Sequence, residues 1–382
     1  MKDLLSLIII LLFLFLAIPY SFYFGLAFKY SNKGSPVRKS GKKITISLII
    51  PTYNEELVIE KKINDVFKLD YPQDLFEVII VDSSTDKTTE IIKEYQKRYN
   101  NIVLIIEKRQ GLAKALNTAY AAAKNEIVIK TDCDSLLEKD VLQKIAADFS
   151  DPAIGGVAGK QAVINDSKVE IDYRSIQSKI QIAESWIDST VIFHPLSAYR
   201  KKLIQPIDPD SLADDSELAI KVRKQGYRTI FDPEILYYEA SHSSFFKRRV
   251  QKDRRGKGLI RLLFRHTDVL FNPKYGNYGK IIFPVNFFMI VLSPYLILTL
   301  LLIIFYMLFQ LNPVIAAFAL ILLILFIYLG QANKLSMFGP VYSFLDTQIS
   351  LLVGGLSLVF GRETGGTWKV DKELRSAYLK ND

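Results

Sequence analysis

The stretch IVIKTDCDSLLEKD, residues 127–140, contains the feature that decides the fold of this chain. Its apolar run at 127–129 predicts a buried strand, and two aspartates, Asp132 and Asp134, follow closely. Similar strand-like runs alternate with helix-like segments on either side. We expect strands at 44–50, 76–81, 102–106 and 126–130, and helices at 56–67, 88–99, 112–124 and 139–149. This alternation predicts an α/β fold, with a mostly parallel sheet covered by helices on both faces.

Polar residues follow three of the predicted strands, as PTYNEE at 51–56, DSSTD at 82–86 and TDCD at 131–134. In parallel sheets, the ligand crevice lies beyond the carboxyl ends of the strands. Capping of the next helix also accounts for Asp, Ser and Thr at such positions. Capping does not account for Asp132 and Asp134 together, because two close carboxylates repel each other unless a counter-ion is present.

Asp132 and Asp134 are therefore candidate ligands of a hard divalent cation, Mg²⁺ or Mn²⁺, shared with substrate phosphates. The glycine-rich stretch GGVAGKQ at 155–161 lacks the spacing and the Ser or Thr of a phosphate-binding loop. The sequence thus gives no support to an ATPase.

Two further segments carry candidate chemistry. Asp214 and Asp215 precede an amphipathic helix expected at 216–225, where one acid can cap the helix and the other can act as a general base. Nine Lys or Arg residues lie between Lys247 and Arg265 against the single acid Asp253. This block predicts a basic amphipathic helix on an anionic lipid surface, and some of its arginines are candidates for holding a diphosphate.

Apolar segments predict a membrane protein. The run from Leu4 to Phe28 exceeds the roughly 20 residues of a membrane-spanning helix. A cleaved signal peptide is the alternative, but the run is too long and lacks a small-x-small cleavage site. Blocks at 281–309 and 314–329 predict a helical hairpin, whereas 335–360 is interrupted by Gly, Pro, Asp and Gln and can span, re-enter or lie at the interface.

Charge predicts the orientation. The segment 29–43 is basic and holds no acid, and the hairpin tip at 310–313 is uncharged, so residues 29–280 are expected in the cytoplasm of a multi-pass cell-membrane protein. Phospholipid head groups account for the net charge of +9 without a nucleic-acid partner. The single cysteine permits no internal disulfide, which agrees with a reducing compartment.

The order and spacing of these motifs resemble glycosyltransferase family 2, membrane-bound type, which includes cellulose, hyaluronan and poly-N-acetylglucosamine synthases and ceramide glucosyltransferases. The resemblance covers roughly residues 44–270. It rests on PTYNE at 51–55, VDSSTD at 81–86, GLAKALN at 111–117, DCD at 132–134, DD at 214–215 and QKDRR at 251–255.

The resemblance implies a GT-A type domain that moves a sugar from a UDP-sugar donor, with inversion, in a metal-assisted single displacement. The acceptor would be a lipid, a lipid-linked glycan or a growing polysaccharide. Asp215 would be the base, with Asp214 beside it. The implied nucleotide-sugar residues are Pro51, Thr52, Glu55, Asp82, Gly111, Lys114 and Asp132. The implied metal ligands are Asp132 and Asp134, with His242 as a candidate third ligand that is otherwise a structural histidine.

One departure concerns the acceptor. The family's Gln-x-x-Arg-Trp reads Gln251, Arg254 and Arg255 here, so the aromatic residue is missing and Trp186 is a candidate replacement. Near the end, ETGGTWKVDKE at 363–373 resembles a loop that closes over the nucleotide, with Trp368 and Lys372 as its contacts; an interfacial anchor is the alternative for Trp368. A cytoplasmic tail then requires three full spans.

The expected division follows: a transmembrane helix (1–28), a basic linker (29–43), the transferase domain (44–245), a basic interface segment (246–280), a transmembrane hairpin (281–334), an interfacial or re-entrant segment (335–361) and a cytoplasmic tail (362–382). Two alternatives remain open. A polyprenyl-phosphate sugar transferase of the dolichol-phosphate mannose type would not need Arg254, and a membrane scaffold with the same fold would lack the chemistry.

Overall fold

The computed structural model describes residues 2–37, 39–41, 43–164, 168–242, 244–332, 334–361 and 371–380. These residues contain one eight-stranded sheet, in the order β3-β2-β1-β4-β7-β6-β8-β5. Its strands are β1 (Ile46–Thr52), β2 (Phe76–Asp82), β3 (Ile102–Ile106), β4 (Ile127–Lys130), β5 (Leu136–Leu137), β6 (Ile154–Val163), β7 (Ser197–Arg200) and β8 (Arg228–Glu239). Strands β3, β2, β1 and β4 run parallel, as predicted.

Helices α2 (Ile59–Phe67), α3 (Thr88–Gln96), α4 (Leu112–Ala122) and α5 (Val141–Asp148) fall within the four predicted ranges. They form because each buries an apolar stripe on the sheet. One face of the sheet packs with residues of α2, α3 and α5, and the opposite face packs with residues of α4 and α7 (Asp214–Lys224). The prediction of an α/β domain with helices on both faces is confirmed.

The other half of the sheet is where the sequence is least informative. Strand β7 is antiparallel to both β4 and β6. Strand β6 contains the glycine-rich stretch, and its glycines are required by packing, since a Cβ on Gly155 would lie 2.6 Å from the Tyr227 Cβ atom. This stretch is therefore a strand and not a phosphate-binding loop.

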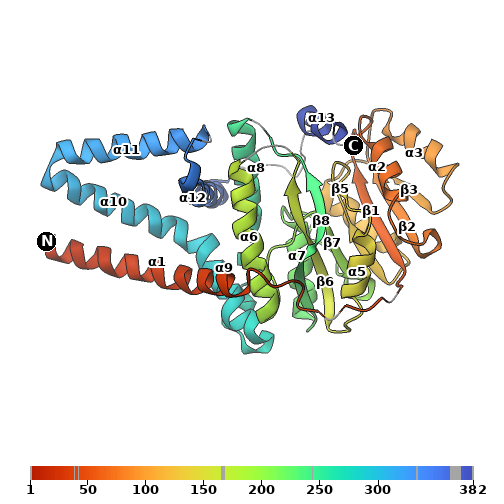
Figure 1. Cartoon of the computed structure of the whole chain (residues 1–382), viewed down its shortest axis with the longest axis horizontal. Helices are drawn as coiled ribbons and strands as arrows, with labels where there is room; N and C mark the ends of the chain where they lie inside the picture. The colour runs from red at the N-terminus through yellow and green to blue at the C-terminus, as the bar shows by residue number, and fades with distance from the viewer. Residues whose placement is uncertain are drawn as a thin grey trace.

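Among the described residues, four helical segments are long and apolar enough to cross a membrane, at Asp3–Tyr30, Tyr278–Leu311, Pro313–Gln331 and Ser336–Val359. The first is α1 (Lys2–Tyr30). The second is a helical run that includes α9 (Phe283–Phe287) and ends with α10 (Ser293–Leu311). The third and fourth are α11 (Pro313–Gln331) and α12 (Gly339–Val359). Figure 1 shows α1, α10 and α11 extending away from the sheet on one side, whereas α12 is viewed nearly end-on and crosses them. That crossing supports an interfacial α12, but length and composition admit four spans, so the expected three spans stay a prediction.

Two helices stand between the sheet and the apolar helices in Figure 1, α6 (Lys168–Ile187) and α8 (Phe245–Arg265). Helix α6 is joined to the apolar helices through Glu184, which is 1% exposed. Glu184 accepts hydrogen bonds from the Tyr23 hydroxyl of α1 and from Asn286 Nδ2 of α9, the latter at 2.6 Å. Because an unpaired carboxylate would be costly at this depth, these contacts fix the domain relative to α1 and α9.

Candidate active site

The acidic residues singled out in the sequence converge on a lysine at the end of β4. Lys130 Nζ lies 3.1 Å from Asp215 Oδ2, 3.4 Å from Asp214 Oδ2 and 3.4 Å from Asp132 Oδ1. The sheet topology causes this convergence, because Lys130 pairs across the ladder with Ser197 of β7. Ser197 Oγ in turn donates to Asp215 Oδ1 at 3.1 Å. The predicted base and the predicted metal ligand thus share one counter-ion.

Burial sets the charge state of this cluster. Desolvation, followed by repulsion from Asp214, raises the pKa of Asp215 to about 8, while the Lys130 ammonium opposes the rise. Desolvation alone would lower the pKa of Lys130, but Asp132, Asp214 and Asp215 together raise it well above its usual value. Lys130 therefore stays charged, and Asp215 is poised to exchange a proton near neutral pH.

A cavity that opens to solvent and is lined by Asp132 lies beside this cluster. It brings Asp132 and Asp134 together with Gln251 and Arg255 of α8, as the sequence motifs predicted. Its lining also includes Gln161, Val163, Glu170, Arg174, Pro195, Glu239, Ala240, Ser241 and Leu374. Arg254 is not part of the lining, but burial lowers its pKa while Asp214 and then Asp132 act in the opposite sense. The basic helix α8 therefore faces the acidic cluster.

Glu239 is an acid that sequence analysis missed. It ends β8, where Ser135 Oγ donates to its Oε1 atom at 2.6 Å and Gln161 Nε2 donates to its Oε2 atom. Burial, then repulsion from Asp132 and Asp134, raises the pKa of Glu239 to about 7. A single Glu at a strand end carries no motif, so only the adjacency of β8 and β6 reveals it.

The oxygen donors of this pocket fit a hard divalent cation. Asp132 and Asp134 have side chains that are 22% and 14% exposed, and Glu239 repels both. Three carboxylates directed at one solvent-connected cavity match the ligand preference of Mg²⁺ or Mn²⁺. Lys62 of α2 fixes the turn that carries Asp132 and Asp134. It donates to the Ser135 carbonyl at 2.6 Å and to Thr131 Oγ1 at 3.1 Å.

The predicted nucleotide residues lie at the ends of β1 and β2. Thr52 Oγ1 donates to Asp82 Oδ1 at 2.8 Å, and the Ser84 amide donates to the same atom at 3.2 Å, so the buried Asp82 is satisfied within the domain. Pro51 directly precedes Thr52 in β1. Gly111 caps α4 with φ +99°, and Lys114 of α4 contacts Gln110. None of these residues lines the cavity around Asp132.

Glu55 is almost fully buried, because the C-terminal helix α13 (Lys372–Leu379) covers it. Arg375 Nε donates to Glu55 Oε2 at 2.7 Å and Arg375 Nη2 donates to Glu55 Oε1. Arg375 Nη1 pairs with Asp134 Oδ2. Arg375 also escaped sequence analysis, since a lone arginine near the end of a chain resembles any solvated residue.

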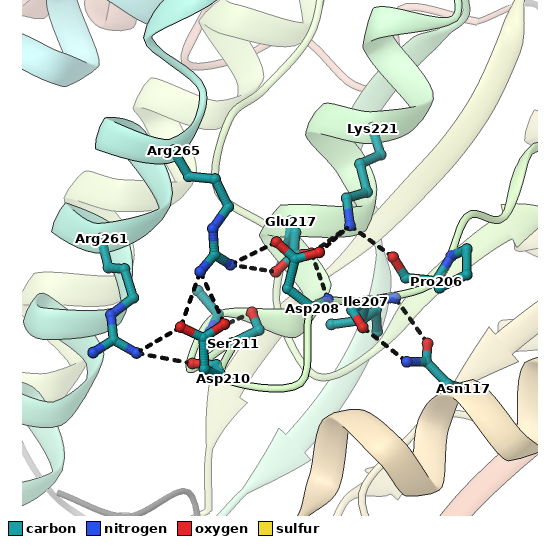
Figure 2. A network of polar contacts seen from close by, with 11 residues as sticks. Asn117, Pro206, Ile207, Asp208, Asp210, Ser211, Glu217, Lys221, Arg261 and Arg265 are labelled. Atoms are coloured by element: carbon teal, nitrogen blue, oxygen red, sulfur yellow. Dashed lines mark hydrogen bonds and ion pairs between the residues drawn. The ribbon is translucent and has the colours of Figure 1, made fainter. Parts of the chain in front are cut away.

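The segment leading to Asp214 is held by a network of charges, which Figure 2 shows. Arg265 of α8 contacts both carboxylate oxygens of Asp210, at 2.9 and 3.0 Å. The Asp208 amide donates to Glu217 Oε1 at 2.8 Å. Because Glu217 belongs to the first turn of α7, the network ties the start of α7 to the interface helix α8 (Figure 2).

Two predicted roles need correction. Trp186 lies at the far end of α6, where Nε1 donates to the Gly34 carbonyl at 3.0 Å and the ring stacks on Tyr30. It therefore anchors the linker after α1 and does not reach the cavity. His242 faces the tail, with Nδ1 3.6 Å from Asp371 Oδ2, and forms a group with Asp371 and Glu373 instead of with Asp132.

Of the predicted loop at 363–373, the structure describes only residues 371–373. Trp368 lies outside the described residues. Lys372 begins helix α13, so this part of the tail is helical.

Comparisons with known proteins show which family and which fold this chain resembles. Residues 47–207 match the sequence model of the family described as Glycosyl transferase family 2. "Probable glycosyltransferase YdaM" of Bacillus subtilis (strain 168) is 31% identical over 210 residues, which cover 51% of this chain and 50% of the relative. "Poly-beta-1,6-N-acetyl-D-glucosamine synthase" of Staphylococcus epidermidis (strain RP62A) is 26% identical over 227 residues, covering 56% and 55%. This chain thus spans about half the length of the curated relatives it matches.

A solved structure extends the similarity beyond the sheet. The mannosyltransferase PcManGT from Pyrobaculum calidifontis, in complex with GDP-Man and Mn²⁺, superposes with a TM-score of 0.78 and 26% sequence identity. The superposition covers 94% of this chain and 100% of that chain. The apolar helices are therefore included in the similarity, and the predicted GT-A type of fold is confirmed.

Proposed function

We propose, from the premise that this chain carries a glycosyl transferase family 2 domain, that it is a membrane-bound, inverting glycosyltransferase that uses a nucleotide-diphospho-sugar. The single observation that carries this proposal is the convergence of Asp132, Asp214 and Asp215 on Lys130, beside a cavity lined by Asp134 and Arg255. A buried acid with a raised pKa, next to a pocket whose carboxylates can hold a divalent cation and whose lining includes arginines, is the arrangement expected of a base working opposite a phosphorylated leaving group.

The donor site is proposed on the cavity side of this cluster. Asp132 and Asp134, with Glu239 nearby, would hold Mg²⁺ or Mn²⁺, which when bound supplies positive charge to the departing diphosphate. Gln251 and Arg255 reach the same cavity from α8. Planar guanidinium groups suit phosphate oxygens, so α8 would contribute the protein's own share of this stabilisation.

Asp215 is proposed as the general base. In its ionised form it would take the proton of an acceptor hydroxyl while the hydroxyl oxygen forms a bond to the anomeric carbon. The bond from that carbon to the diphosphate breaks in the same step, and the nucleoside diphosphate leaves on the opposite face. One new glycosidic bond forms with inversion, and the proton remains on Asp215. Lys130 would favour the ionised form of this carboxylate against the opposing effects of burial and Asp214.

The acceptor is proposed to be a lipid, a lipid-linked glycan or a growing polysaccharide that reaches the site along the membrane surface. Helix α8 carries the cavity residues Gln251 and Arg255 near its middle and contacts α12 at the neighbouring Gly256, where Gly256 and Gly354 allow the two backbones to approach closely. The site therefore sits directly beside the apolar helices. The basic linker at 29–43 supports a cytoplasmic catalytic domain.

Two donor classes are supported by different observations. The sequence motifs favour a UDP-sugar, as the resemblance to polysaccharide synthases implies. The similarity to the mannosyltransferase bound to GDP-Man favours a GDP-sugar. The acids and cations of the site would meet the sugar and the diphosphate, which both donor classes share, so both donors are compatible with them.

The test is release of nucleoside diphosphate by the full-length protein in lipid nanodiscs, with Mn²⁺, a panel of UDP- and GDP-sugars and a membrane lipid extract as acceptor. Mass spectrometry of the products then identifies the donor sugar and the acceptor together. We expect one donor class to turn over and its sugar to appear on a lipid or glycan. Absence of turnover with every donor would favour the scaffold hypothesis instead.

A further inference from the structure

The C-terminal helix α13 inserts a cation into the acidic pair. The Arg375 side chain is 2% exposed, and its guanidinium forms a fork on both carboxylate oxygens of Glu55 while its remaining arm pairs with Asp134 Oδ2. Of the two aspartates, Asp132 is paired with Lys130, which belongs to the sheet, and Asp134 is paired with Arg375, which belongs to the tail. Lys130 is fixed in the sheet, whereas Arg375 can move away from Asp134 if α13 undocks.

Helix α13 is docked by a few contacts that can be broken together. Tyr378 is buried in the core on the face of the sheet that α2, α3 and α5 cover, and it donates to Asp65 Oδ2 of α2 at 3.0 Å. At the other end of the helix, Lys247 of α8 pairs with Asp371 at 2.9 Å and with Glu373 at 3.0 Å. A segment of this length held by few buried groups is the kind of element that opens below the global unfolding free energy.

Leu374 adds a steric argument, because it forms part of the wall of the cavity that contains Asp132 and Asp134. With α13 docked, the tail both narrows this cavity and neutralises one of its two aspartates. Glu55, at the start of the predicted nucleotide site, is 4% exposed under the same helix. The docked helix therefore restricts the donor side of the site in three ways at once.

We propose that α13 is an autoinhibitory element in which Arg375 competes with the divalent cation for Asp134, so that the ion and the docked tail exclude each other. This inference rests on the proposed function, since it requires a metal at Asp132 and Asp134. The Arg375 guanidinium already pairs with Asp134 Oδ2, so an ion bound to this carboxylate would lie a few ångströms from a positive charge, and like charges repel strongly where the surroundings are dry.

Competition has a reciprocal consequence. If the docked α13 weakens ion binding, then the bound ion must weaken the docking of α13 by the same factor, and removing the Arg375 interaction should strengthen ion binding. Coupling of this kind commonly changes affinity by about 5- to 150-fold. Displacement would also expose Glu55 and widen the cavity beside Leu374, so that metal arrival would prepare the site for the donor.

The test measures the affinity for Mn²⁺ by electron paramagnetic resonance, with the full-length protein in nanodiscs and without donor. We expect Arg375→Gln to bind Mn²⁺ at least about tenfold more tightly than the wild type. The matched control is Arg174→Gln, which removes an equal charge from the cavity wall but contacts Glu170 instead of Asp134. An equal gain in both variants, or no gain in Arg375→Gln, would overturn the competition.

Two further arms separate this inference from the proposed function. Asp134→Asn should abolish tight Mn²⁺ binding; if it does not, the proposed metal site itself is wrong, whatever Arg375 does. Hydrogen exchange of residues 371–380 in the wild type should speed up at least about tenfold when Mn²⁺ is added. This measurement needs no variant, and unchanged or slower exchange with Mn²⁺ bound would show that metal and tail coexist.

Discussion

Lys130 Nζ lies 3.1 Å from Asp215 Oδ2, although 85 residues separate the two in the chain. The contact joins the last residue of β4 to the first turn of α7. Since the same ammonium is 3.4 Å from Asp132, one buried cation relates the proposed base to the proposed metal ligand. The geometry of the reaction is therefore set by the interior of the domain and not by a surface loop.

Replacing Asp215 by Asn should reduce turnover by roughly 10²- to 10⁴-fold, because an amide cannot accept the proton of the acceptor hydroxyl. Donor affinity, measured by calorimetry, should change little. The wild-type kcat/KM should rise with pH up to about 8, since the raised pKa of Asp215 leaves it protonated at lower pH. Asp214→Asn is the matched control, with a smaller loss expected; equal turnover of wild type and Asp215→Asn would reject the base assignment.

Lys130→Met should destabilise the domain strongly. Its side chain is 3% exposed, and three carboxylates would lose their common counter-ion. Breaking a buried ion pair by removing one partner costs about 3–5 kcal/mol. Thermal unfolding of the purified protein measures this as a lower Tm. The control is Lys97→Met, since Lys97, directly after α3, is 69% exposed and its loss should leave Tm nearly unchanged.

Asp148 should make the domain less stable as pH rises. It is buried against Asp232 beneath the linker, where Ser35 Oγ donates to it at 3.0 Å. Desolvation, then repulsion from Asp232, raises its pKa to about 9. The folded domain thus keeps a proton that the unfolded chain releases above pH 4, so stability is lost between about pH 4 and 9.

Asp148→Asn removes this titration. Between pH 5 and pH 8, the Tm of the variant should fall by roughly 5 °C less than that of the wild type. Asp74→Asn, at an exposed position, should retain the wild-type pH dependence. Parallel curves for Asp148→Asn and the wild type would show that Asp148 is ionised throughout this range.

Gly258 should be required where α8 packs on the segment before Asp214. A Cβ at this position would lie 2.9 Å from both the Leu212 Cβ atom and the Leu212 carbonyl oxygen. Gly258→Val must therefore move α8 away from that segment, which is already held by the network in Figure 2. We expect turnover to fall by about tenfold or more, as small misplacements of catalytic groups do. Gly25→Ala, with open space around the new Cβ, is the control and should retain activity.

Trp186→Ala should leave acceptor KM unchanged, because the indole packs on Tyr30 and Gly34 and not on the cavity. Loss of the ring and its hydrogen bond should instead lower Tm by a few degrees. A raised acceptor KM at an unchanged Tm would restore the acceptor role that the sequence suggested.

The parallel half of the fold was predictable because its signals are local. Apolar runs of strand length, such as 127–129, alternate with amphipathic helices, and parallel strands must place their carboxyl ends at one edge. Asp132 and Asp134 could therefore be singled out as candidates from their place after a strand, whereas Asp215 was singled out by the motif order that the family resemblance implies. The antiparallel half was not predictable in the same way, since β6 contains three glycines and β7 is four residues long.

The sequence by itself thus determined the α/β domain, the apolar helices and the candidates Asp132, Asp134 and Asp215, because each is marked by its neighbours in the chain. Only the tertiary structure decided which charges meet them. Lys130, Glu239 and Arg375 join the site because β7 and β8 return to the sheet and α13 folds back on β1. Such contacts arise from burial across large sequence separations, where an isolated Lys, Glu or Arg has no local pattern to mark it.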